Sequence, residues 1–109
     1  MAKKKLKKIL KKIKKSAIGK ENKKELLKMF DALKEEIKSL SETDAEHAKS
    51  IAAFSEISAY EATRKEKDPR LLKHAIGGLN SSVDDFEVSH PELVRIVNSI
   101  SLMLSNIGI

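Results

Sequence analysis

Two acid-x-x-His pairs are the residues of this chain whose types and spacing most resemble a metal site. Asp44 lies three residues before His47, and Glu87 lies three residues before His90. On a helix this spacing brings the carboxylate and the imidazole to one face, and some four-helix bundles use two such pairs with two further glutamates to hold two metal ions. Here the first pair overlaps a helix start, the second directly precedes Pro91, and no glutamate on another helix completes the set. We therefore expect no metal.

Catalytic and cofactor chemistry has no other support in the sequence. The chain has no cysteine, which excludes disulfides, thiolate metal sites and cysteine nucleophiles. It also lacks a glycine-rich phosphate loop, a nucleophile elbow and a Ser/His/Asp set at recognisable spacing. We expect a protein that is not an enzyme, has no catalytic residues and no cofactor, and takes no small-molecule substrate.

The most distinctive segment is the N-terminal stretch MAKKKLKKILKKIKKSAIGK, residues 1–20, which carries ten lysines and no acidic residue. Its net charge is +10, whereas residues 21–109 have a net charge of −4. Aliphatic residues recur within it at helical spacing, which predicts an amphipathic helix; its apolar side consists of Leu6, Ile9, Leu10 and Ile13. The candidate binding residues are the lysines of the other side: Lys3, Lys4, Lys5, Lys7, Lys8, Lys11, Lys12, Lys14 and Lys15.

Such a basic amphipathic arm has two classes of anionic target. At an anionic membrane surface the lysines are attracted to the headgroups and the apolar side inserts. On a nucleic acid the lysines neutralise phosphates without reading the sequence, and the aliphatic residues have no use. Two further alternatives stay open, namely a solvated tail and a helix whose apolar side docks on the rest of the chain. We take membrane attachment as the functional hypothesis and nucleic-acid binding as the alternative.

Residues 21–109 predict an all-α fold, because glycine and proline are scarce and apolar residues recur in heptads. A helix is expected over about residues 22–40 and a second over about 44–67, although the heptad phase also allows these two to be one unbroken helix. After the start signal at Asp68-Pro69, the 4 and 3 spacings continue through Pro91 without a slip. The segment SHPEL taken alone is also a helix start signal, but this continuity favours one long helix, kinked near Pro91 and about 58 Å long, over two helices in a hairpin.

The end of that helix is apolar on more than one side, which led us to expect a second copy as its cover. The chain is therefore predicted to be a homodimer. The residues expected at the interface are Leu93, Ile96, Val97, Ile100, Met103, Leu104 and Ile107.

The predicted organisation is a basic arm, residues 1–20, followed by a helical bundle domain or coiled coil, residues 21–109. The bundle consists of two short helices and one long kinked helix. The longest charge-free stretch, Ile96–Ile109, is too short to span a bilayer. We expect a cytoplasmic protein attached at the periphery of a membrane.

Part of the sequence resembles a known family. Phe86 followed by SHPEL, and the terminal LSNIGI, are similar to the ending of the short bacterial helical proteins of domain-of-unknown-function family 4404. The segments LLKMFDALKEEI and DAEHAKSIAAFSEI are similar to that family's paired short helices. The resemblance covers about residues 24–109 and excludes the arm. It implies a small helical protein and offers no catalytic residues to carry over.

Overall fold

The computed structural model describes residues 2–15 and 19–108, with side chains from residue 7 onward. Within these ranges the chain forms α-helices and one 3₁₀ turn, without β-strands. The elements are α1 Ala2–Lys15, α2 Lys20–Ser41, α3 Ala45–Thr63, α4 Pro69–Val83, the 3₁₀ turn Asp84–Phe86 and α5 Pro91–Ile107. The prediction of an all-α bundle is confirmed. None of the helices in the described residues is long and apolar enough to cross a membrane.

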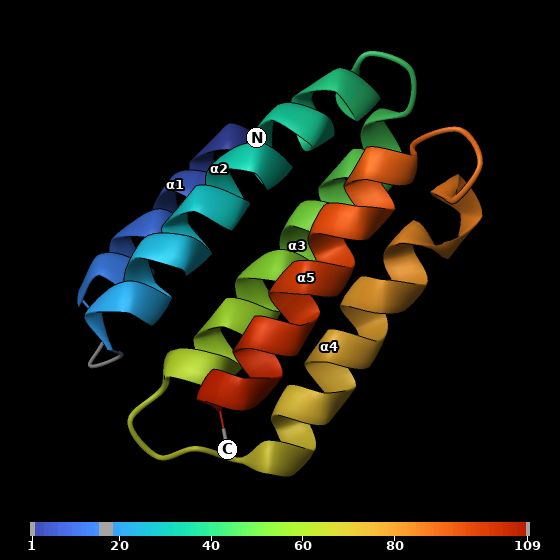
Figure 1. Ribbon diagram of the computed structural model, residues 1–109. Helices are drawn as coiled ribbons and strands as arrows, with labels where there is room; N and C mark the ends of the chain where they lie inside the picture. Colours follow the sequence, from blue (N-terminus) through green and yellow to red (C-terminus); the bar gives the residue numbers. More distant parts are fainter. Residues whose placement is uncertain (1, 16–18, 109) are drawn as a thin grey trace.

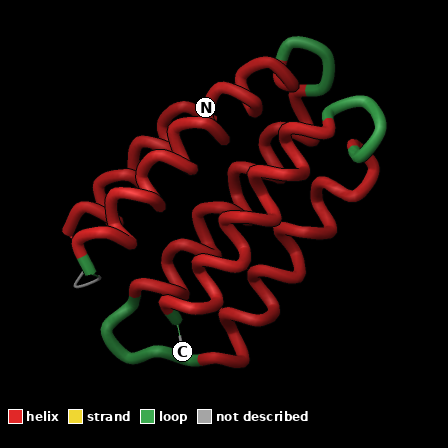
Figure 2. The backbone as a smooth tube through the Cα atoms, viewed as in Figure 1, coloured by secondary structure: helices red, strands yellow, loops and turns green. Residues whose placement is uncertain are grey.

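The helices form an up-and-down bundle in which consecutive helices run antiparallel (Figures 1 and 2). Helix α3 occupies the centre, since it packs against each of the other α-helices of the described chain. Helices α1 and α2 pair on one side of it, and α4 and α5 pair on the other, with α5 also packing against α2. The bundle measures 37 × 24 × 21 Å.

Helices α2 and α3 are separate, and the break between them is capped by side chains. Helix α2 buries the predicted heptad residues Leu26, Phe30, Leu33, Ile37 and Leu40. Helix α3 then starts after Asp44, whose carboxylate accepts a hydrogen bond from the backbone N–H of His47 at 3.1 Å. Asp44 is thus the N-cap of α3.

The prediction of one long kinked helix from residue 69 is wrong. Helix α4 ends at Val83, the chain reverses through the 3₁₀ turn and residues 87–90, and α5 begins at Pro91. A helix of about 58 Å would also exceed the 37 Å length of the bundle. Proline restricts the residue before it to non-helical conformations, and His90 accordingly has φ −138° and ψ 65°. The heptad phase persists because both helices bury their apolar stripes in the same core.

The C-terminal residues that we expected a second copy to cover are largely buried within the chain's own bundle. Five of the seven are buried, and Met103 and Ile107 are partly buried against the same core; the buried ones are Leu93, Ile96, Val97, Ile100 and Leu104. The cover that we expected from a partner comes from α2, α3 and α4. The reason for expecting self-association at these residues is therefore lost, and the homodimer itself stays a prediction.

The close approach of α4 to α3 depends on a glycine. A Cβ atom placed on Gly78 would overlap the ring of Phe54 on α3, whereas a Cβ on the adjacent Gly77 would meet no atom within 4 Å. Both glycines lie inside α4. Close packing therefore requires a glycine at Gly78 but not at Gly77.

We predict opposite effects of alanine at these two glycines. Gly77→Ala stabilises the protein by about 0.5–1 kcal/mol, because alanine costs less backbone entropy in a helix. Gly78→Ala is destabilising relative to Gly77→Ala by about 1–3 kcal/mol, because the Phe54 ring must move. Urea unfolding followed by circular dichroism measures both, and equal stabilities of the two variants would contradict the packing assigned to Gly78.

Candidate functional site

The apolar side of α1 is packed into the bundle. Ile9 and Ile13 are 1% and 0% exposed and belong to the same core as α2, α3, α4 and α5, and Leu10 is partly buried against that core. The side chain of Leu6 lies outside the described residues. The arm that we expected apart from the bundle domain is therefore a helix that lies against α2 and α3. Of the alternatives that the sequence leaves open, the structure shows the helix whose apolar side docks on the rest of the chain.

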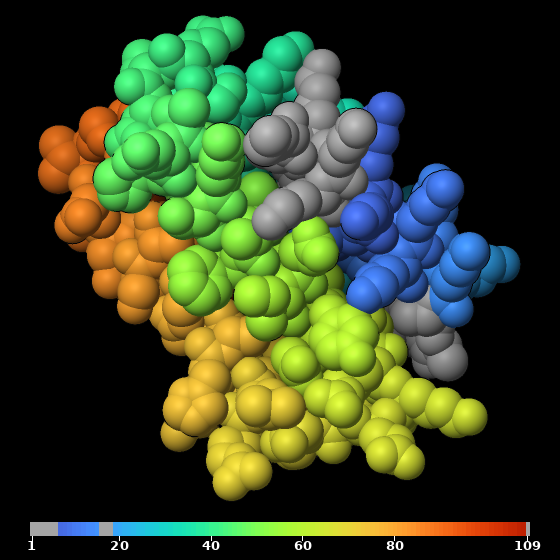
Figure 3. Space-filling view, turned by 180° about the vertical axis from the view of Figure 1, so that it is seen from behind, coloured from blue at the N-terminus to red at the C-terminus, as the bar shows by residue number. Residues whose placement is uncertain are grey.

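Docking turns the lysine side of α1 toward solvent. All the lysines of α1 whose side chains are described are exposed: Lys7, Lys8, Lys11, Lys12, Lys14 and Lys15. The side chains of Lys3, Lys4 and Lys5 are not among those described. Within the described part of the chain, none of the six lysines takes part in an ion pair. We call these six residues the lysine face; Figure 3 shows α1, in blue, at the surface beside α3.

Helix α3 contributes an aromatic residue to the lysine face. The Nζ atom of Lys12 lies 4.2 Å from the ring centroid of Tyr60, and the guanidinium carbon of Arg64 lies 5.7 Å from the same centroid. Both distances are within the range of cation–π attraction. Arg64 also donates a hydrogen bond to Glu61 at 2.9 Å, and this bond raises the pKa of Arg64 above its ordinary value.

Sequence reasoning missed Tyr60 and Arg64 as neighbours of the lysine face. The available signal was weak: Tyr60 is the only tyrosine in the chain, and it lies four residues before Arg64 on a predicted helix. Residues four apart share a helix face. The contact with Lys12 joins residues that are far apart in sequence, so only the packing of α1 on α3 reveals it.

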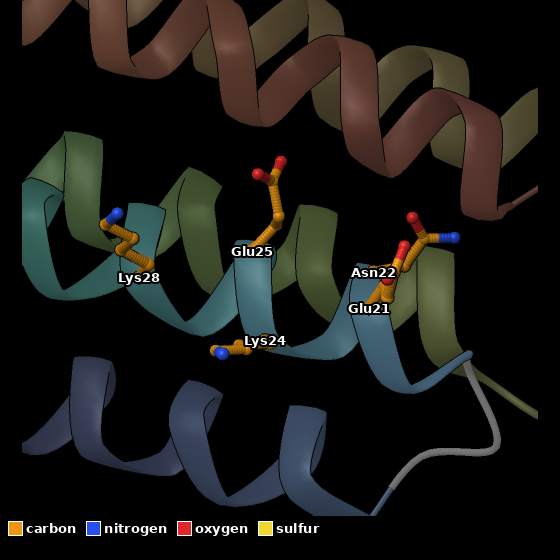
Figure 4. Close-up of a pocket in the computed structure, with 5 residues that line it drawn as sticks. All are labelled: Glu21, Asn22, Lys24, Glu25 and Lys28. Atoms are coloured by element: carbon orange, nitrogen blue, oxygen red, sulfur yellow. The ribbon is translucent and has the colours of Figure 1, made fainter.

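A hollow lies along α2, and the residues that line it do not form a binding site. Glu21, Asn22, Lys24, Glu25 and Lys28 surround about 460 Å³. In Figure 4 these side chains fan out from a single helix and do not converge on a common point. Their charges also have both signs, so the hollow offers no defined ligand chemistry.

The histidines of the two acid-x-x-His pairs contact one and the same aromatic ring. The ring of Phe86 has its centroid 5.3 Å from that of His47 and 5.7 Å from that of His90, in edge-on contacts. His47 Nδ1 lies 2.7 Å from the Asp44 carboxylate, and His90 Nδ1 lies 3.0 Å from Ser89 Oγ. Among the side chains that the structure describes, no three of the metal-ligating types gather as a metal site would require.

Comparison with known proteins places most of the chain in a family. The model of the family described as Domain of unknown function (DUF4404) matches residues 26–109. The chain belongs to this family. The DUF4404 match begins within α2, so α1 and its lysine face lie outside it, whereas Tyr60 and Arg64 lie inside. No match was found among curated proteins or solved structures.

The burial of α1 predicts a large effect of truncating its core residue. Ile13→Ala is expected to lower the free energy of unfolding by about 2–5 kcal/mol, because it leaves a cavity at a fully buried position. Lys8→Ala, on the exposed side of the same helix, is the control and should change the stability by less than about 0.5 kcal/mol. Urea unfolding provides the measurement. An Ile13→Ala protein as stable as the control would mean that α1 does not pack on the bundle.

The cap of α3 predicts a pH dependence of stability. The backbone N–H of His47 lowers the pKa of Asp44 below its ordinary value. A carboxylate with a lowered pKa in the folded state stabilises that state above its unfolded pKa and loses this effect as the pH falls through the folded value. Asp44→Ala should therefore be less stable than the natural chain at neutral pH, and the difference should shrink in acid. Thermal unfolding across this range, with exposed Asp31→Ala as control, tests the effect; a difference independent of pH would contradict it.

Proposed function

We propose that this protein is a non-catalytic binding protein that attaches to an anionic membrane surface through the lysine face of α1. The observation that carries the proposal is the exposure of six lysines on one helix whose Ile9 and Ile13 are buried in the bundle. A lysine near an anionic membrane contributes about 1 kcal/mol of attraction. Because α1 is already a helix docked on the bundle, binding does not have to order its backbone.

The docked state of α1 changes the expected mode of attachment. Ile9 and Ile13 are buried in the bundle and cannot insert into a bilayer while α1 stays there. Attachment by the docked helix is therefore mainly electrostatic, and salt should weaken it. Insertion of the aliphatic side requires α1 to leave the bundle, and such binding would persist at high salt.

The exposed residues beside the lysine face support a membrane over a nucleic acid. Tyr60 is 44% exposed and Ile57 is 48% exposed, and their spacing of three residues places them on the same side of α3. Tyrosine is enriched at membrane interfaces, where an apolar ring and a polar hydroxyl suit the headgroup level. An aliphatic side chain such as Ile57 gains nothing from a phosphate backbone.

The test is binding to vesicles of phosphatidylcholine mixed with phosphatidylglycerol. Replacing the six lysines of the lysine face by glutamine should weaken partitioning by at least about 100-fold at low salt. The matched control replaces six exposed lysines elsewhere: Lys24, Lys28, Lys38, Lys49, Lys65 and Lys73. It has the same net charge and should retain most of the binding.

Equal binding by the two sixfold variants would contradict the proposal, because net charge alone would then account for attachment. Stronger binding of the natural chain to duplex DNA than to the vesicles, at the same salt concentration, would favour the nucleic-acid alternative. Circular dichroism of each variant ensures that a loss of binding is not a loss of folding.

A further inference from the structure

A hollow lies at the junction of α1 and α3, at the edge of the lysine face. It encloses about 300 Å³ and is lined by Lys11, Lys12 and Lys15 from α1 and by Tyr60, Thr63 and Arg64 from the last turns of α3. We call it the α1–α3 hollow. In Figure 3 it belongs to the region where the blue atoms of α1 meet the yellow-green end of α3. Two helices that are distant in the sequence thus contribute cations to one concave surface.

The charges around the α1–α3 hollow are almost all positive. Three ammonium groups and one guanidinium line it, and the Tyr60 ring lies close to both Lys12 and Arg64. Two carboxylates act on Arg64: Glu61 accepts one hydrogen bond from it, and Asp68 attracts it without a hydrogen bond, so that the other donors of the guanidinium remain for a ligand. The hydroxyl of Thr63 donates to the carbonyl of Ala59 at 2.7 Å, so a ligand must rely on the cations.

This chemistry suits a phosphate monoester. Such a group carries a charge of about −1.5 to −2 at neutral pH and has three strong acceptor oxygens. A guanidinium forms paired hydrogen bonds to phosphate, and lysines add point charges around it. A phosphodiester has one negative charge and would use fewer of the four cations. The exposed Ile57 and Tyr60 on the same side of α3 point to a ligand presented at an apolar interface.

We propose that the α1–α3 hollow binds the terminal phosphate of an anionic lipid headgroup. This inference rests on the proposed function and adds a headgroup preference to it. The lysine face supplies attraction to any anionic membrane, and the hollow discriminates a monoester from a diester. Arg64 and Tyr60 are the residues that give the hollow this selectivity, because they add a guanidinium fork and an aromatic wall to the lysines.

The first experiment compares vesicles containing phosphatidic acid with vesicles containing phosphatidylglycerol, adjusted to the same zeta potential. The full chain should bind the phosphatidic acid vesicles several-fold more tightly. Arg64→Gln should abolish this preference while retaining the phosphatidylglycerol binding of the lysine face. Arg70→Gln, an exposed arginine on α4, removes the same charge away from the hollow and should retain the preference.

In a second pair of variants, one member is expected to strengthen the preference, which a folding defect cannot imitate, and the other is its control. Glu61→Gln releases Arg64 from its ion pair and should increase the preference for phosphatidic acid. Glu46→Gln changes the net charge equally at the other end of α3 and should leave the preference unchanged. An equal response of the two variants would overturn the role assigned to Arg64.

The source of the phosphate is distinguished by titration in solution. Tyr60 is the only tyrosine and the chain has no tryptophan, so tyrosine fluorescence reports directly on the hollow. Glycerol phosphate should perturb this signal only weakly, at millimolar concentration, whereas phosphatidic acid vesicles should perturb it at micromolar lipid. Equal responses to the two would overturn the assignment to a lipid.

Failure of this inference is separable from failure of the proposed function. Equal binding to the two kinds of vesicle would overturn the headgroup preference and leave membrane attachment standing. Absence of binding to either kind at low salt would overturn both.

Discussion

The central position of α3 depends on small side chains. The other α-helices of the described bundle all pack against it, and helices can approach one another closely only where the facing side chains are short. Its buried residues are mostly alanine and serine: Ala48, Ala52, Ser55, Ser58, Ala59 and Ala62, with Ile51 as the larger member. The Oγ atom of Ser58 is buried and has no hydrogen-bond partner among the described residues.

The contact between α1 and α3 gives the lysine face its form. An isolated helix with so many lysines and no acidic residue repels itself, since like charges four residues apart destabilise a helix. Packing of Ile9 and Ile13 into the core opposes this repulsion. The net charge of −4 on residues 21–109 opposes it too. The Lys12–Tyr60 contact and the hydrogen bond from Lys23 Nζ to the Lys14 carbonyl tie the helix at its C-terminal end. The result is a cationic surface on a helix that is packed against the bundle.

Local signals in the sequence predicted the helices well where the residue types act within one turn. Asp68 caps α4 as expected, accepting hydrogen bonds from the backbone N–H groups of Arg70 and Leu71. Heptad phase was misleading between Val83 and Pro91, because a repeat of apolar residues reports which side of each helix is buried and not whether two helices are joined. The break between α4 and α5 had a local signal in His90-Pro91. Proline restricts the backbone conformation of the residue before it, and this restriction outweighed the heptad periodicity.

The sequence alone determined the all-α class, the membership of residues 26–109 in a helical family and the concentration of lysine in the first helix. These follow from composition and short-range spacing, which do not depend on the path of the chain. Tertiary structure decided what the apolar residues of α1 and α5 contact, because an apolar stripe specifies burial without naming its partner. It also decided that Lys12, Tyr60 and Arg64 meet in one hollow, since only the packing of α1 against α3 brings these distant residues within a few ångströms.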